Sequence, residues 1–194
     1  MINFNKILEN EWEHLVSATK TAKHPFHQFI LSNSINNHPD SRTMVLRYVD
    51  KQNRKIRFNT DKRSPKYTAL LNNNSIAALF YDYARKIQLR IKGNACINNE
   101  NERRLTWDDM ALESKMCYLG NNAPSSILQN YEPNIPIKKI TEISDEEYEL
   151  GYINFVNFEI TIDSLDWLYL SSSGHRRVKY TWYENKIVTN WIAT

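Results

Sequence analysis

The spacing of hydrophobic and polar residues along the chain changes near Pro39. Before that point apolar residues recur at the spacing of one helix face. They predict an amphipathic helix over about residues 5–20, with Ile7, Leu8, Trp12, Leu15 and Val16 on one side. His24-Pro25 interrupts this pattern, and we expect a short helical turn over 26–31. Beyond Pro39 apolar and polar residues alternate with the period of two that is typical of β-strands.

Period-two segments predict strands at 43–49, 55–60, 76–83, 86–97, 152–162, 165–171 and 175–183, with 186–192 as a candidate. Ser64-Pro65 predicts a helix start, because serine is a good cap and proline fits the first helical position. A second helix is expected over about 100–118, followed by an Asn-, Pro- and Ser-rich loop at 119–140, and together they form an insertion. That loop is either a lid or a dimer arm. The pattern predicts one domain over 1–194, mainly β in the α+β class, built as an antiparallel barrel with peripheral helices.

Composition narrows the functional classes. The chain has 194 residues, a formal charge of only +3 and 4 glycines. This charge is too small to indicate nucleic-acid binding, and neither G-x-G-x-x-G nor a Walker motif occurs. There is no long apolar run, so we expect a soluble cytoplasmic protein without a membrane segment. The histidines and the 2 cysteines show no metal-ligand spacing, and we expect free thiols, with Cys96 buried.

Cationic and amide side chains lie on or beside several predicted strands. Strand alternation sends Arg42 and Arg47 to opposite faces, and it places Gln88 beside Arg90. Lys66 lies in the first turn of its predicted helix, where backbone N–H groups favour an anion. Each of these cations, taken singly, also fits a solvated barrel rim. The face that carries Gln88 and Arg90 must meet water, a partner or an anionic ligand, and the spacing of the whole set favours more than a solvated rim.

Several short segments follow one another along the chain: R-T-M-V-L-R, F-N-T-D, R-S-P-K, F-Y-D-Y, I-Q-L-R-I-K-G and the late D-W-L-Y-L-S-S-S-G-H-R-R-V-K-Y. The order of these motifs resembles the pyridoxamine 5'-phosphate oxidase-related, FMN-binding family. The likeness covers about residues 39–95 well and 150–194 less tightly. The resemblance implies a split β-barrel homodimer that binds FMN at the subunit interface.

The resemblance also implies residue roles. It makes Arg42 a ligand of the FMN phosphate and places Met44, Val45 and Leu46 along the isoalloxazine. Arg47 stands where the oxidases have a lysine near flavin and substrate. Trp167 and Arg177 are contributed by the partner subunit. The full set of expected cofactor-binding residues is Arg42, Thr43, Met44, Val45, Leu46, Arg47, Asn59, Thr60, Ser64, Lys66, Gln88, Trp167 and Arg177.

Departures from the family pattern bear on activity. The oxidases hold their substrate with an Arg-x-His pair, whereas here Ser173 precedes His175 by two positions. We expect Arg47 and His175 to orient the substrate. Lys115, Tyr118 and Ser125 are the nearest candidates for the oxidases' substrate-phosphate grip. Ser125 or Ser126 is alternatively a contact of the FMN phosphate.

These matches predict an FMN-dependent oxidoreductase with an unknown small-molecule substrate. The alternatives are a genuine pyridoxamine 5'-phosphate oxidase, a non-enzymatic flavin- or pyridoxal-phosphate-binding protein, and a barrel without a cofactor. The absorption spectrum of the purified protein separates the last of these from the others.

Overall fold

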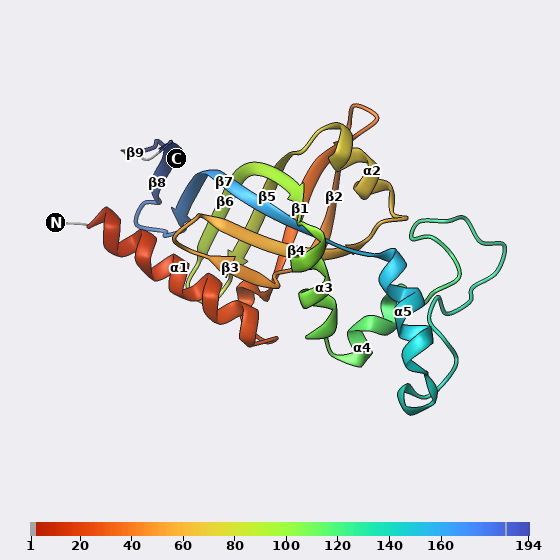
Figure 1. Ribbon diagram of the computed structural model, residues 1–194. Coiled ribbons are helices and arrows are strands. Elements are labelled where there is room, and N and C mark those ends of the chain that lie inside the picture. Colours follow the sequence, from red (N-terminus) through yellow and green to blue (C-terminus); the bar gives the residue numbers. More distant parts are fainter. Residues whose placement is uncertain (1–2, 185) are drawn as a thin grey trace.

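The structure is a computed structural model, and it describes residues 3–184 and 186–194 (Figure 1). Three residues of the predicted domain, 1–2 and 185, lie outside the described residues. The strands are β1 (Gln28–Ile35), β2 (His38–Val45), β3 (Tyr48–Asp50), β4 (Lys55–Asp61), β5 (Ser75–Asp82), β6 (Ile87–Ile97), β7 (Phe155–Tyr169), β8 (Arg176–Tyr183) and β9 (Lys186–Trp191). The α-helices are α1 (Phe4–Lys20), α2 (Pro65–Asn72), α3 (Glu100–Asp108), α4 (Leu112–Lys115) and α5 (Asp145–Asn154), with short 3₁₀ turns η1 (Pro25–His27), η2 (Met116–Tyr118) and η3 (Ile140–Glu142).

The strands form one antiparallel sheet in the order β2-β1-β5-β6-β7-β4-β3, and β8 and β9 extend it from β7. β6 and β7 are the long central strands, and their register shifts between Lys92 and Gly93. A Cβ atom on Gly93 would lie 2.1 Å from the Thr161 carbonyl oxygen, so only glycine fits this close approach. The bulge lets one strand bend around the core. The predicted mainly-β, α+β architecture is confirmed.

The strands share one hydrophobic cluster, and α1 packs against them and contributes Trp12, Leu15 and Ala18 to it. α1 lies across the strands on one side, and α2 lies at another end of the sheet (Figure 1). The two ends of the described chain meet, because the Phe4 and Trp191 rings lie 5.2 Å apart edge to face. The helix predicted over 5–20 is therefore present as α1, and its apolar face is part of the core.

The barrel closes at Leu46 and Arg47, where a single continuous strand was predicted over 43–49. The Leu46 amide donates to the His27 carbonyl, and the Arg47 amide donates to the Arg57 carbonyl, each at 2.9 Å. The chain therefore leaves the β1 side at Leu46 and joins the β4 side at Arg47. The prediction was wrong because alternation in sequence does not reveal a change of partner strand.

The segment 26–31 was wrongly predicted as a helical turn. Only Pro25–His27 is a 3₁₀ turn, and β1 starts at Gln28 and pairs with both β2 and β5. Its burial alternates, with Phe29 and Leu31 in the core and Ile30 exposed. Two predicted strands, 152–162 and 165–171, are instead the single strand β7.

The helix predicted over 100–118 is divided into α3, α4 and η2, so that prediction was too long. The following segment is largely irregular through 119–139, and α5 then leads directly into β7. Ser144 starts α5 with a capping box, in which its hydroxyl accepts from the Glu147 amide. Together, residues 98–154 form an insertion that extends away from the sheet beside β4 (Figure 1). Cys96 is exposed rather than buried, because it lies on the outer face near the end of β6.

Candidate active site

A tight turn after β4 builds the first part of the site. Asp61 accepts hydrogen bonds from the Arg63 amide at 2.7 Å and from the Arg63 guanidinium at 2.6 Å, and its own carbonyl accepts from the Ser64 hydroxyl at 2.7 Å. Ser64 is the N-cap residue of α2, but its side chain does not cap the helix. The turn therefore holds the Ser64 hydroxyl, and this hydroxyl does not accept a hydrogen bond from the first amides of α2.

Two cations face one cavity at this end of β2. The cavity, here named the Lys66 cavity, has a volume of about 330 Å³ and is lined by Asp40, Arg42, Ser64, Pro65, Lys66 and Ser125. The Lys66 ammonium donates to the Thr60 hydroxyl at 2.8 Å. Burial lowers the pKa of Lys66, and the positive charge of Arg42 lowers that pKa further. An anion bound between these cations would remove this repulsion.

Arg42 is not free in this structure. Its guanidinium pairs with Asp40, bonds the Asn33 amide oxygen, and donates to the Leu31 carbonyl at 3.3 Å. The Asp40 side chain is 48% exposed, whereas the Arg42 side chain is 19% exposed. Asp40 therefore holds the guanidinium from the solvent side, where a stronger anion can take its place.

Arg47 and Asn59 line a second cavity of about 560 Å³ between β4 and the insertion. Its other lining residues are Thr19, Tyr48, Arg57, Leu105, Thr106, Asp109, Met110, Ala111, Ser114 and Asn157, and we call it the Asn157 cavity. Arg47 is exposed, and among the described residues its guanidinium has no hydrogen bond or ion pair. Arg57, by contrast, donates to Glu159 and Glu102 at 2.7 Å each.

The remaining predicted residues on β2 divide between the two faces of the strand. Met44 and Leu46 are buried in the core, Thr43 is exposed and Val45 is half-buried. A ligand lying along this edge therefore meets the Thr43 and Val45 side chains, and it meets Met44 and Leu46 through their backbone.

A third group of predicted residues lies on β6, β7 and β8 and lines neither cavity. Gln88 and Arg177 both pair with Leu168 and so share one sheet face. Arg177 forms a two-point ion pair with Asp166, with donor–acceptor distances of 2.9 and 2.7 Å. Trp167 points to the opposite face, where it is 7% exposed and its indole donates to Glu11 at 3.2 Å.

His175 lies on the turn between β7 and β8, where its Nδ1 accepts from the Ser171 amide at 3.1 Å. It is exposed and lines neither cavity. Within one chain, the structure thus brings Arg42, Ser64 and Lys66 together, and Arg47 with Asn59. It does not bring the β6–β8 group to either of these sets.

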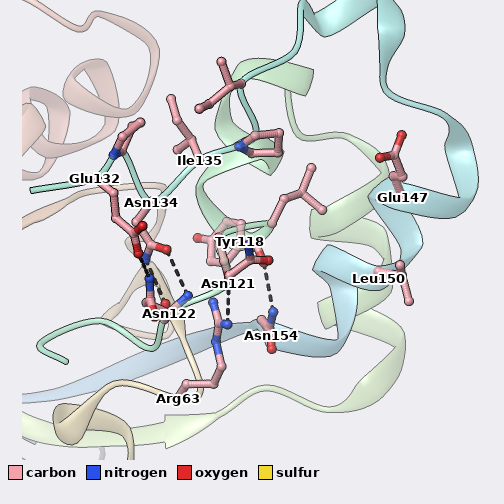
Figure 2. Close-up of a pocket in the computed structure, with 15 residues that line it drawn as sticks. Arg63, Tyr118, Asn121, Asn122, Glu132, Asn134, Ile135, Glu147, Leu150 and Asn154 are labelled. Atoms are coloured by element: carbon pink, nitrogen blue, oxygen red, sulfur yellow. Dashed lines mark hydrogen bonds between the residues drawn. The ribbon is translucent and has the colours of Figure 1, made fainter. Parts of the chain in front are cut away.

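The loop cavity, lined by the 119–137 segment and α5, has a volume of about 640 Å³ (Figure 2). Arg63 reaches into it and donates to the Gly120 carbonyl at 2.8 Å, and Asn154 donates to the Tyr118 carbonyl at 2.9 Å (Figure 2). The Asn134 side chain bonds the Asn122 backbone twice, since its oxygen accepts from the Asn122 amide and its nitrogen donates to the Asn122 carbonyl, which fixes the loop. The Arg63–Gly120 bond ties the insertion to the turn after β4, and the Tyr118 ring packs against Phe155 at the start of β7, whereas Ser125 lines the Lys66 cavity. Lys115 and Ser126 line none of the three cavities described here.

Sequence reasoning missed several residues that define these cavities. Asn33 and Asp40 escaped notice because the start of β1, residues 28–31, was predicted as part of a helical turn and the pairing of β1 with β2 was unknown. Thr106 and Asn157 lie far apart along the chain. They come together because the Asn157 amide on β7 bonds the Thr106 hydroxyl on α3. The polarity of Asn157 within the otherwise apolar segment FVNFEI is the one signal that the sequence offers.

Within residues 3–184 and 186–194, no helix has the length and apolar character needed to cross a membrane. Over the same ranges, no group of three or more His, Cys, Asp or Glu side chains is placed to hold a metal ion.

Part of the chain matches a family of known proteins. Residues 9–99 match the family model described as pyridoxamine 5'-phosphate oxidase, FMN-binding domain. This segment contains the Lys66 cavity except for Ser125, which the insertion supplies. The resemblance inferred from the R-T-M-V-L-R and R-S-P-K motifs is thereby confirmed over this part of the chain. No curated protein matches the sequence.

Solved structures share the fold over nearly the whole chain. A pyridoxamine 5'-phosphate oxidase-related, FMN-binding protein from Nostoc punctiforme is 18% identical, with a TM-score of 0.72 and coverage of 95% of this chain and 96% of that one. PhzG from Burkholderia lata, solved with tetrahydrophenazine-1-carboxylic acid, is 18% identical, with a TM-score of 0.69 and coverage of 98% and 92%. A Clostridium acetobutylicum protein related to general stress protein 26 is 16% identical, with a TM-score of 0.54 and coverage of 98% and 97%. The chain therefore has the split-barrel fold of these proteins.

Proposed function

We propose that this chain binds FMN, with the cofactor phosphate in the Lys66 cavity. The observation that carries the proposal is the half-buried ammonium of Lys66, whose pKa is lowered by burial and by the neighbouring Arg42. A lysine and an arginine at a helix start form a favourable phosphate site, because the anion neutralises both charges and accepts their hydrogen bonds. The family match supports FMN as the source of that phosphate.

The flavin ring is proposed to lie along β2 toward Arg47 and Asn59. In this arrangement Thr43 and Val45 provide side-chain contacts, and the backbone of Met44 and Leu46 provides the edge. When bound, FMN supplies hydride transfer to or from a small molecule. The chain's own contribution is to position the ring and to orient the substrate, for which Arg47 has an unengaged guanidinium. His175 stays a predicted substrate-orienting residue.

A homodimer is proposed to complete the site. Ile30 and Tyr81, 41% and 42% exposed, lie on the outer sheet face with Leu79 and Leu168. Gln88 lies between Tyr81 and Leu168 in a cross-strand row that ends at Arg177, so these residues would lie at the interface with a second copy docked on this face. The Trp167 indole is bonded to Glu11 inside its own chain, so we expect Trp167 to position this region rather than touch the flavin.

The binding experiment compares FMN with riboflavin, which lacks the phosphate. Flavin fluorescence is titrated with wild-type protein, with Arg42→Ala and Lys66→Ala, and with Lys23→Ala as an exposed lysine control. We expect each cavity variant to weaken FMN binding by about 10- to 100-fold, the usual effect of losing one charge-assisted hydrogen bond. Riboflavin affinity should not change. Equal losses for FMN and riboflavin, or no loss, would show that the phosphate lies elsewhere.

The dimer is tested by light scattering with Tyr81→Glu, using Tyr83→Glu as the control on a turn residue that is 82% exposed. We expect Tyr81→Glu to give monomers that bind FMN weakly and Tyr83→Glu to behave as wild type. A monomeric wild-type protein with full FMN affinity would refute the shared site.

The activity is proposed to be oxidoreduction of a small molecule, and two alternatives remain. A genuine pyridoxamine 5'-phosphate oxidase would turn over pyridoxamine phosphate at a metabolic rate, and Ser173 in place of the expected arginine argues against it. A non-enzymatic flavin-binding protein would retain FMN tightly but show no turnover with any electron acceptor. Steady-state assays on the FMN-loaded protein distinguish these outcomes.

A further inference from the structure

Two residues that line the Asn157 cavity carry buried amide oxygens without hydrogen-bond partners. Across the described residues, the Oδ1 atoms of Asn59 and Asn157 are both buried and unpaired. The two asparagines face each other across the β4–β7 ladder and line the same cavity. A buried acceptor without a donor destabilises the folded protein. The cavity therefore favours a ligand that brings N–H or O–H donors.

The chain itself fixes the orientation of the Asn157 amide. The Thr106 hydroxyl donates its only proton to the Glu102 carbonyl at 2.7 Å. Toward Asn157 it can therefore only accept, and Asn157 Nδ2 donates to it at 3.0 Å. The Asn157 oxygen must then point away from Thr106. Asn157 is 1% exposed, so this oxygen is held in place rather than free to rotate toward solvent.

The charged residues that line the cavity favour a ligand with one negative charge over a ligand with two. Arg47 is the lining cation without a partner among the described residues, whereas Arg57 is committed to two carboxylates, Glu159 and Glu102. Asp109 adds a negative charge to the lining. A dianionic phosphate would therefore be poorly compensated and would face the lone pairs of the asparagine oxygens. A carboxylate needs only the one guanidinium.

We propose that the Asn157 cavity is the substrate pocket and takes an unphosphorylated carboxylic acid bearing N–H or O–H donors. The carboxylate pairs with Arg47, and the donors meet the oxygens of Asn157 and Asn59. Thr106 is a positioning residue, since it holds the Asn157 amide in the accepting orientation. The role of this cavity in catalysis rests on the proposed FMN site, but ligand binding is measured separately from flavin binding.

The test is calorimetric titration of the protein, with and without FMN, using four probes: 3-aminobenzoate, benzoate, aniline and phenyl phosphate. We expect 3-aminobenzoate to bind about tenfold more tightly than each of the others, as one added hydrogen bond or ion pair predicts. Arg47→Gln should remove the advantage over aniline. Asn157→Leu should remove the advantage over benzoate. The exposed-lysine control Lys23→Gln should keep both advantages.

Thr106→Val provides a second variant that leaves Asn157 in place. It should reduce the preference for 3-aminobenzoate over benzoate while the preference over aniline remains. A variant that merely unfolds would lose both preferences and its melting transition. Phenyl phosphate binding as tightly as 3-aminobenzoate would overturn the proposal. Displacement of 3-aminobenzoate by FMN would also overturn it, since the cavity would then belong to the flavin.

Failure of the two proposals is distinguishable. If FMN does not bind but 3-aminobenzoate shows the expected preferences in the free protein, the FMN site is wrong and the acid pocket stands. If FMN binds and the four probes bind equally or not at all, the acid pocket is wrong and the FMN site stands.

Discussion

Glu11→Ala should be strongly destabilising, because Glu11 is a buried carboxylate that joins α1 to the barrel. The Glu11 side chain is 2% exposed and accepts two bonds from Arg85, each at 3.0 Å, and one from the Trp167 indole at 3.2 Å. Arg85 keeps its second partner, Asp82, so the loss is that of hydrogen bonds to a charged group, about 1.5–3 kcal/mol. At about 2–4 °C of melting temperature per kcal/mol for a chain of this size, the expected loss is roughly 3–12 °C.

Glu9→Ala is the matched control, since it makes the same change in the same helix. Glu9 pairs with Lys51, but these side chains are 49% and 42% exposed, and such a pair contributes at most about 1 kcal/mol. Urea unfolding followed by tryptophan fluorescence gives both free energies of unfolding. If Glu11→Ala cost no more than Glu9→Ala, the buried contact would not anchor α1, and the reasoning from burial would be refuted.

Two further predictions concern local structure. The pKa of His24 is lowered by burial and by the neighbouring His14, whose Nδ1 lies 3.2 Å from His24 Nε2. The unfolded chain therefore binds the proton more readily than the folded chain. The contribution of neutral His24 to the free energy of unfolding is present above about pH 6.5 and is lost as the pH falls below it. In urea unfolding at pH 7.5 and 5.5, His24→Asn should lose less stability than wild type, and an equal loss would contradict the assignment. Gly93→Ala should lower the free energy of unfolding by at least about 2 kcal/mol, because the alanine Cβ would lie 2.1 Å from the Thr161 carbonyl oxygen. An unchanged urea midpoint would show that the bulge tolerates a side chain.

The sequence was sufficient for those parts of the fold whose signals are local. α1 has an apolar face, α2 has a Ser-Pro start, and β4, β5 and β6 alternate cleanly, so their positions follow from the chain. The motifs also indicated that Arg42 and Lys66 serve one anion, and these residues do line one cavity. The identity of that anion stays a prediction.

What the sequence did not reveal depends on pairing between distant segments. β1 follows a proline-containing turn, and only its pairing with β2 and β5 makes residues 28–35 a strand. The break at Leu46 is likewise a consequence of barrel closure, which no local pattern encodes. The pairing of Thr106 with Asn157 depends on where the insertion packs against β7, so the Asn157 cavity was invisible in the sequence.

The insertion at residues 98–154 leaves and rejoins the sheet at adjacent positions, because Ile97 and Phe158 are cross-strand neighbours. A segment with neighbouring ends can change in length or sequence while the strands that flank it keep their register. Here that segment supplies Ser125 to one cavity and Thr106, Met110 and Ser114 to the other, whereas the cations come from the sheet and α2. The sheet and α2 thus supply the cations, and the insertion supplies lining residues whose replacement leaves the strand register intact. Exchange of this insertion between split barrels is a route by which ligand choice can diverge while the fold persists.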